Sequence, residues 1–467
     1  MSARSLSILL VLCMLISTPL TASAQASGPV YIVQAGDSLS IIAGKFNVSM
    51  EELMQANGIS DPNQIQAGQE LIIPGLEGVS GILDTEVIQF GDSYRSLLRR
   101  TQLPEDLFDQ LNHLVSPTEF YVGASMTIPV DQVESESTSQ HSIGTGESLL
   151  ELAIKNNTNV WSLTGFNHLK GTWAGIPGDV LYRKGGLNVS SATGLPSAFI
   201  SAEIRDLPIK QGGTGVIKIQ TGPGTTLGGL LVDHELKFFS EQDGLHIALQ
   251  GVHALLDPGV YPLRLDATLE NGTTQSYEQM ILITSGFYNE ITITVPSETL
   301  NPSVTDPENQ LLIGLTSNVT PIKQWQGKFK LPVDTQACIK DWFGIRRTYY
   351  GIGTDIKLNG FHSGVDYGIC SETHPFEIYA PAAGTVVFSG PLTVRGNATL
   401  IDHGWGVFTG YWHQEESYVE VGDHVEAGNL IGKIGGTGRV TGPHLHWEVW
   451  VNGVQVDPLD WLDKEYP

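Results

Sequence analysis

An internal repeat near the N-terminus constrains the fold most, because a chain that begins with repeated small units cannot fold around one core. Residues 30–74 open with an alternating apolar segment and pass through Gly36-Asp37-Ser38 into a helical pattern, and they close with a second apolar segment before Pro74. Asp37 and Ser38 carry the side-chain oxygens expected at a helix N-cap. The pattern predicts a compact β-α-α-β unit, and weaker copies follow at residues 86–130 and 141–184.

The first of these units resembles a LysM domain over its whole length. The resemblance implies binding to glycans that contain N-acetylglucosamine, such as peptidoglycan or chitin. The second copy departs from the family pattern at Arg99-Arg100, where the family has a small helix residue, and the third departs at Arg183, in place of a terminal proline. We expect glycan binding by the first unit, whereas the second and third are either binding units or spacers.

The rest of the 467-residue chain is too long for one additional core, so we expect three or more domains in all. The stretch from Glu134 to Gln140 is rich in Ser and Glu and is typical of a solvated linker. Residues 196–298 contain short strand signals separated by Gly, Pro and Asp turns. This spacing predicts an immunoglobulin-like β-sandwich, which acts as a spacer or regulates access.

The first 24 residues have the pattern of a secretory signal peptide. Arg4 is followed by an apolar run from Ile8 to Ile16 and by the small residues Ala22-Ser23-Ala24. This run is shorter than the ~20 residues that span a bilayer, which favours cleavage after Ala24 over an uncleaved anchor. We expect a protein of the cell envelope or medium whose mature part has no membrane span.

The amino-acid composition gives further information on the binding partners and the cellular compartment of the protein. The chain has 25 basic and 50 acidic residues, a net charge of -25, which argues against a nucleic-acid partner. Beyond the signal peptide only Cys338 and Cys370 remain. In an oxidising compartment they favour a disulfide, and the alternative of a cysteine-ligated zinc lacks further cysteines.

Histidines gather in the C-terminal part, with seven of thirteen within residues 326–467. His362 and Asp366 flank a glycine and can converge on one ion. His444 and His446 lie two apart in a strand pattern, so their side chains share a face. His413 lies in another strand, next to aromatic residues. Each group taken alone also fits a structural role.

Together these segments resemble the lysostaphin/LytM-type zinc metalloendopeptidases, whose catalytic domain is mainly antiparallel β. The resemblance places this domain at residues 326–467. The resemblance implies that His362, Asp366 and His446 bind Zn²⁺, and that His413 and His444 orient the attacking water and stabilise the oxyanion. The matching segments also include Phe343-Gly344-Ile345-Arg346-Arg347, Ile401-Asp402-His403-Gly404, Val421-Gly422-Asp423-His424-Val425, Gly436-Thr437-Gly438 and Val456-Asp457-Pro458.

The chemistry of this ligand set agrees with the resemblance. Two neutral imidazoles and one carboxylate leave a +1 zinc site with an open position, which is typical of hydrolytic zinc. We therefore expect a secreted endopeptidase that cuts the peptide cross-links of peptidoglycan, with peptide stems and glycan as its partners. A catalytically inactive relative that activates an amidase, or a purely glycan-binding protein, is the alternative. All five expected positions are filled, which favours the enzyme.

Overall fold

The computed structural model describes residues 28–76, 78–114, 120–130, 138–144, 146–184, 194–334, 337–368 and 376–467. The predicted signal peptide, residues 1–24, lies outside these ranges. Within them, no helix combines the length and apolar character needed to cross a membrane. The chain divides into two compact units, one with the described residues of Met1–Asp84, Glu105–Asn112 and Thr127–Glu134, the other with those of Thr85–Pro104, His113–Met126 and Ser135–Pro467.

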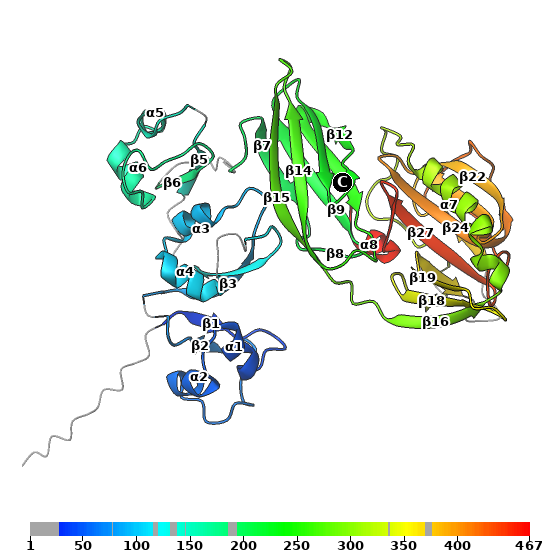
Figure 1. The fold of residues 1–467 in the computed structure, drawn as a ribbon, viewed down its shortest axis with the longest axis horizontal. Helices are drawn as coiled ribbons and strands as arrows, with labels where there is room; N and C mark the ends of the chain where they lie inside the picture. The colour runs from blue at the N-terminus through cyan, green and yellow to red at the C-terminus, as the bar shows by residue number, and fades with distance from the viewer. Residues whose placement is uncertain are drawn as a thin grey trace, which may run out of the picture. The chain divides into compact units, whose positions relative to one another are not determined.

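The N-terminal region repeats the order strand, helix, helix, strand three times, as predicted (Figure 1). β1 pairs antiparallel with β2, and β5 pairs antiparallel with β6. The elements are β1 (Val30–Ile32), α1 (Leu39–Lys45), α2 (Met50–Asn57) and β2 (Glu70–Ile72); β3 (Ile82–Val87), α3 (Tyr94–Thr101), α4 (Glu105–Asn112) and β4 (Ser125–Val130); and β5 (Thr138–Ser142), α5 (Leu149–Lys155), α6 (Val160–Phe166) and β6 (Val180–Lys184).

One asparagine at the end of the second helix holds each repeat together. Asn57 donates to the carbonyl of Ile72 and accepts from its amide, at 2.8 and 2.6 Å. Asn112 and Asn167 form the same pair of bonds to the backbone of the residue 15 positions later. Because each side chain also donates to the carbonyl four residues before it, helix end and last strand are fixed to each other.

Arg99, which departs from the family pattern in the second repeat, has a structural role. Its side chain is 6% exposed and forms an ion pair of 2.9 Å with Asp179, which is also buried. It donates a further hydrogen bond of 3.0 Å to the carbonyl of Val180. Arg95 approaches the same carboxylate at 3.3 Å. The arginine therefore attaches helix α3 to the third repeat, which explains the loss of the small residue.

The middle region contains two sheets that share one hydrophobic cluster. Their orders are β11-β10-β14-β15-β8 and β12-β13-β9-β7, and the cluster draws on both, for example through Ile217 of β9 and Leu265 of β14. An immunoglobulin-like relationship remains a prediction. The elements are β7 (Phe199–Ile204), β8 (Ile209–Lys210), β9 (Thr214–Thr221), β10 (Thr226–Leu231), β11 (His234–Glu235), β12 (Phe238–Ser240), η1 (Gln242–Gly244), β13 (Leu245–Gly251), β14 (Gly259–Thr268) and β15 (Thr274–Thr284).

The C-terminal region is built on a ten-stranded sheet with the central order β17-β20-β27-β24-β23-β22-β25, paired antiparallel as predicted. The elements from the end of the middle region onward are β16 (Glu290–Val295), η2 (Ser297–Leu300), α7 (Pro302–Thr316), β17 (Cys338–Asp341), β18 (Arg346–Gly351), β19 (Lys357–Phe361), β20 (Val365–Gly368), β21 (Glu377–Tyr379), β22 (Gly384–Leu392), β23 (Gly396–Asp402), β24 (Val407–Ser417), β25 (His424–Val425), β26 (Leu430–Ile434), β27 (His444–Val451), β28 (Val454–Val456) and α8 (Pro458–Asp463).

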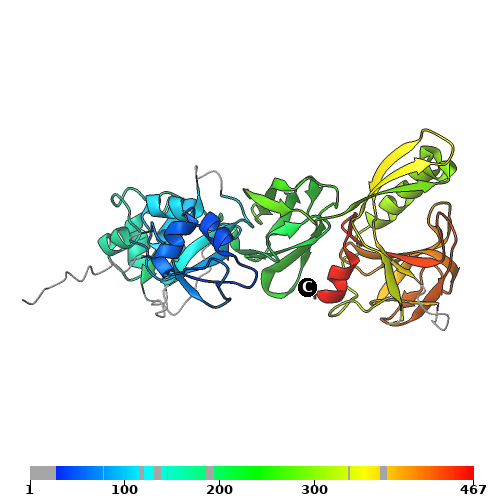
Figure 2. The ribbon, with the colours of Figure 1, turned by 90° about the horizontal axis from the view of Figure 1, so that it is seen from below.

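Strand β16 differs from the expectation. The sequence placed Ile291–Val295 in the sandwich of residues 196–298, but β16 pairs in parallel with β18, in a sheet of order β16-β18-β19. Helix α7 follows and lies over the large sheet (Figure 1). Its Leu312 packs against Phe408, Trp412 and Trp450 of that sheet. In Figure 2, the yellow hairpin of β18 and β19 lies at the same end of the C-terminal region as α7. Residues before the predicted start at 326 therefore belong to this fold.

Glu308 fixes α7 to the sheet from a buried position. Its carboxylate accepts bonds from the amides of Val394 and Arg395, at 2.9 and 3.1 Å, and from the Arg395 guanidinium at 2.8 Å. Its side chain is 4% exposed. Removing one partner of such a pair leaves a buried charge without compensation.

We therefore expect Glu308→Ala to lower the free energy of unfolding by about 3 kcal/mol. Asp306→Ala, on the exposed side of the same helix, is the matched control and should change it by less than about 0.5 kcal/mol. Urea unfolding followed by tryptophan fluorescence measures both. Equal stability of the two variants would show that the pair does not hold the helix.

Candidate metal centre

The first two site residues flank the turn into strand β20. His362 follows β19 directly, and Asp366 is the second residue of β20. Gly364 lies between them for a steric reason, because a Cβ atom there would lie 2.2 Å from the carbonyl oxygen of Trp447 and 2.9 Å from Nε2 of His446. Only glycine therefore lets this turn approach strand β27.

Strand β27 supplies the other two histidines of the C-terminal motif. It pairs with β20, so that Asp366 lies opposite His446. Leu445 and Trp447 point into the hydrophobic core on one side of the sheet. His444 and His446 are on the opposite face, because side chains alternate along a strand.

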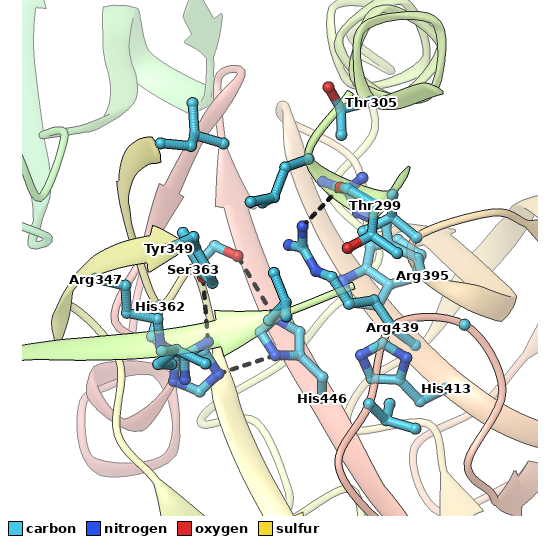
Figure 3. Close-up of a pocket in the computed structure, with 18 of the residues that line it drawn as sticks. Thr299, Thr305, Arg347, Tyr349, His362, Ser363, Arg395, His413, Arg439 and His446 are labelled. Atoms are coloured by element: carbon cyan, nitrogen blue, oxygen red, sulfur yellow. Dashed lines mark hydrogen bonds between the residues drawn. The ribbon is translucent and has the colours of Figure 1, made fainter. Parts of the chain in front are cut away.

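Three side-chain atoms converge where these strands meet. Nε2 of His362 lies 3.0 Å from Oδ1 of Asp366 and 3.0 Å from Nδ1 of His446. Nδ1 of His446 lies 2.8 Å from the same carboxylate oxygen. Nε2 of His444 is 3.7 Å from that oxygen. All three predicted zinc ligands are thus brought together, with His444 at the edge of the group. Figure 3 shows two of them, His362 and His446.

The remaining hydrogen bonds define which ring nitrogens carry protons. Nδ1–H of His362 donates to the carbonyl of Trp342 at 2.8 Å, and Nε2–H of His446 donates to Glu448 at 3.1 Å. In their neutral forms, both rings therefore present a lone pair to Asp366. Three lone pairs facing one another repel unless a cation joins them, and two imidazoles with one carboxylate suit zinc at its usual ~2.0–2.2 Å.

The charges around these ligands favour a cation at the same point. Burial raises the pKa of Asp366, but His362 and His446, which donate to its carboxylate when their rings are protonated, outweigh burial and hold that pKa well below its usual value. Burial lowers the pKa of His446, yet Asp366 and Glu448 raise it to about 9. The two carboxylates therefore attract positive charge strongly, and a metal ion meets the same attraction.

His413 occupies a strained position on the neighbouring strand β24. Its φ of 65° lies in the left-handed region, which costs a residue other than glycine about 1–3 kcal/mol. Its amide donates to the carbonyl of Arg395 and its Nδ1–H to the carbonyl of Thr437, each at 2.8 Å. Burial, with the nearby His446 and His444, lowers the pKa of His413 to about 3.

His413 and His444 form a second pair beside the three ligands. Their ring centroids are 5.0 Å apart. Nδ1–H of His444 donates to the carbonyl of Gly442 at 2.8 Å, so this ring, like that of His413, has its Nε2 lone pair available. The pair can therefore accept protons next to the ligand triangle.

The site lies in a cavity of about 650 Å³. One wall comes from η2 and α7, and includes Thr299 and Thr305. Figure 3 shows His413, Arg395 and Arg439 on one side of His446, and His362 on the other.

Sequence reasoning missed the groups that orient the ligands. Glu448 had no assigned role, although it lies two residues after His446 on the same strand face. Burial raises its pKa, but the hydrogen bond from His446 lowers it to about 2, so the carboxylate is ionised. The other orienting groups are backbone carbonyls, of Trp342 and Thr437, which no residue type reveals.

Among the described residues of the C-terminal region, the other histidines do not contribute ligands. His403 is fully buried, donates to the carbonyl of Ala383 and accepts from Thr409. His424 is exposed, next to Glu426. Cys338 is disulfide-bonded, whereas its predicted partner Cys370 lies outside the described residues.

An antiparallel β domain with converging His, Asp and His ligands has the features of a metallopeptidase. Residues 360–458 match the family "Peptidase family M23", and residues 31–74 match "LysM domain". The C-terminal region thus contains an M23 peptidase domain, and the N-terminal region contains a LysM domain.

The similarity to known proteins covers only part of the chain. It is 40% identical over 98 residues to DD-carboxypeptidase/endopeptidase Mpg of Neisseria meningitidis, covering 21% of this chain and 22% of the relative. Peptidoglycan DD-endopeptidase ShyA of Vibrio cholerae is 35% identical over 130 residues, or 28% of this chain and 29% of the relative. The solved catalytic domain of lysostaphin from Staphylococcus simulans is 32% identical, covering 22% of this chain and 81% of that one, with a TM-score of 0.21. The chain thus spans less than a third of the length of Mpg and of ShyA.

Variants of two histidines distinguish a residue that binds the metal from a residue of the second pair, His413 and His444. We expect the unaltered chain to retain about one zinc ion after dialysis and His446→Ala to retain almost none, because the latter loses a ligand. His413→Ala should keep its zinc, as should the control His424→Ala. Metal analysis of the purified proteins measures this, and zinc retention by His446→Ala would contradict the assigned ligand set.

The carboxylate of Glu448, which orients the His446 ring, is expected to affect zinc affinity. We expect Glu448→Gln to weaken zinc affinity by about 10- to 100-fold, because the His446 ring loses a charged acceptor that fixes its orientation. Competition with a chelator of known affinity measures the change. Glu426→Gln, at an exposed carboxylate beside His424, is the matched control. An unchanged affinity in Glu448→Gln would remove this role.

Proposed function

We propose that the chain is an exported, zinc-dependent endopeptidase that hydrolyses the peptide cross-links of bacterial peptidoglycan. The convergence of His362, Asp366 and His446 within 2.8–3.0 Å carries the proposal, together with the family match over residues 360–458. Two relatives, a DD-carboxypeptidase/endopeptidase and a peptidoglycan DD-endopeptidase, support the substrate class.

In this proposal His362, Asp366 and His446 hold the zinc ion. When bound, zinc polarises the scissile carbonyl and lowers the pKa of water at its open position toward ~7. The carbonyl of Trp342 and the carboxylate of Glu448 keep both imidazoles in the ligating tautomer.

His413 and His444 handle protons in the same proposal. Burial keeps His413 neutral at neutral pH, and its Nε2 can accept a proton as water attacks. Once protonated, an imidazole at this place donates to the developing oxyanion. His444 lies beside Asp366 and acts on the same reacting atoms. The 5.0 Å separation of the two rings lets both approach one substrate carbonyl.

The N-terminal region directs the enzyme to the wall. The match of residues 31–74 to the LysM domain supports binding to N-acetylglucosamine-containing glycan. This contact gains nothing from charge, because the net charge of -25 repels an anionic wall. The signal-peptide pattern of residues 1–24 supports export to the cell envelope.

Release of muropeptides from purified peptidoglycan tests the proposal. We expect the zinc-loaded chain to release them, a chelator to stop the release and added zinc to restore it. His413→Ala should lower the rate by at least about 100-fold while keeping its zinc, because it removes a proton acceptor. His424→Ala, an exposed histidine of the same domain, should act like the unaltered chain. Undiminished release by His413→Ala or in the presence of chelator would refute the proposal.

A further inference from the structure

Three arginines line the cavity of the metal centre in a chain whose net charge is -25. Arg347 forms an ion pair with Asp341, and Arg395 forms one with Glu308 at 2.8 Å. Arg439 differs, because no carboxylate lies within ion-pair distance of it in the part of the chain that the structure describes. The cavity therefore contains one guanidinium whose charge the protein leaves unmatched.

The backbone of Arg439 is held in a fixed place relative to the site. Its amide donates to the carbonyl of Val394 at 2.8 Å. Two residues earlier, Thr437 accepts from His413 and donates its hydroxyl to the carbonyl of Gln414, each at 2.8 Å. Gly438 between them has a φ of +78°, and a Cβ there would lie 2.4 Å from the amide nitrogen of Gly396. The loop that orients His413 is thus the loop that carries Arg439.

The side chain of Arg439 uses only some of its N–H donors in hydrogen bonds to the protein. Nη1 donates to the carbonyl of Thr299 at 3.0 Å, and the guanidinium lies 5.1 Å from the centre of the Tyr349 ring. A guanidinium has five N–H donors. The others face the cavity or solvent, since none is a buried atom without a partner. Arg439 can therefore form a two-bond contact with a carboxylate.

We propose that Arg439 binds a free carboxylate carried by the substrate carbon that is attached to the scissile nitrogen. The inference rests on the proposed function and narrows its substrate class. Figure 3 shows Arg439 on the same side of His446 as His413, which is the side where the proposed proton acceptor meets the reacting atoms. A carboxylate on the carbon next to the scissile nitrogen is among the substrate groups nearest to those atoms.

This requirement distinguishes between kinds of cross-link. When D-alanine acylates an amino group of diaminopimelate, the carbon that bears this nitrogen also bears a free carboxylate. In the interior of a glycine bridge, the corresponding carbon bears an amide. In a direct link to the side chain of lysine, it bears no carboxyl group. The inference therefore assigns the enzyme to D-alanyl bonds formed with diaminopimelate, and to C-terminal D-alanyl residues with a free carboxylate.

A matched pair of peptides tests the inference on the zinc-loaded full chain. The peptides share the D-alanyl bond and differ only in a carboxylate or a carboxamide on the carbon attached to the scissile nitrogen. We expect kcat/KM of the unaltered chain to favour the carboxylate by roughly 10- to 100-fold, the size typical of a charged hydrogen-bonded contact. Arg439→Gln should reduce the rate on the carboxylate peptide to that on the carboxamide, which should itself stay unchanged.

Two further variants control for folding and charge. Arg439→Lys keeps the charge without the planar fork and should recover part of the preference. Arg264→Ala, at a half-exposed arginine of strand β14, should keep the full preference. An equal loss on both peptides in Arg439→Gln would mean that the residue only supports the fold, and would overturn the inference. So would the absence of a preference in the unaltered chain.

Calorimetric binding of the amino-side product, diaminopimelate, gives a readout besides turnover. We expect Arg439→Gln to bind it at least about 10-fold more weakly than the unaltered chain, and equal binding would overturn the inference. If the unaltered chain binds diaminopimelate through Arg439 but releases nothing from peptidoglycan, the proposed activity fails while the carboxylate site stands. If it digests peptidoglycan without preferring the carboxylate peptide, the inference on Arg439 fails alone.

Discussion

The structure of the site depends on the convergence of three ligand atoms on one point. His362, Asp366 and His446 each direct a lone pair at the same small volume, with the three atoms 2.8–3.0 Å apart. The tautomers that produce this arrangement are fixed by hydrogen bonds from the other nitrogen of each ring. His362 donates to the carbonyl of Trp342, and His446 donates to the ionised carboxylate of Glu448. The domain therefore holds three ligand atoms around one point, where a proton on His446 or a metal ion relieves the repulsion between them.

The sheet determines where these groups lie. Strand β27 is bonded to β20 on one side and to β24 on the other, so Asp366, His446 and Trp412 lie in one row across three strands. His413 follows Trp412 and reaches the site through its left-handed backbone. Farther along β27, Trp450 lies on the same face and is covered by α7. The metal centre is thus the part of this face that the helix leaves open, which explains why α7 lines the cavity.

Side chains with strong local patterns could be predicted from the sequence, and groups defined by the backbone could not. Alternation along β27 placed His444 and His446 on one face, and the resemblance to a known family joined them to His362 and Asp366. The role of Glu448 could be predicted only if strand β27 stayed regular for two residues beyond His446, so that both side chains lay on one face. The pairing of β16 with β18 had no local signal, because an alternating strand does not show which sheet it joins. The carbonyls that orient His362 and His413 could not be predicted either, because they belong to the backbone and their positions depend on the tertiary fold.

In the proposed function a chain with a net charge of -25 acts on an anionic polymer, and the local distribution of charge explains how. The net charge of -25 is spread over the molecule, and screening confines each exposed charge to about 8–10 Å in physiological salt. Inside the cavity the balance is local: Asp341 and Glu308 neutralise Arg347 and Arg395, and the proposed zinc ion would offset Asp366 and Glu448. Arg439 remains without a carboxylate partner among the described residues. In the two proposals taken together, the acidic surface repels the wall without specificity, whereas the cavity selects a substrate that carries its own carboxylate.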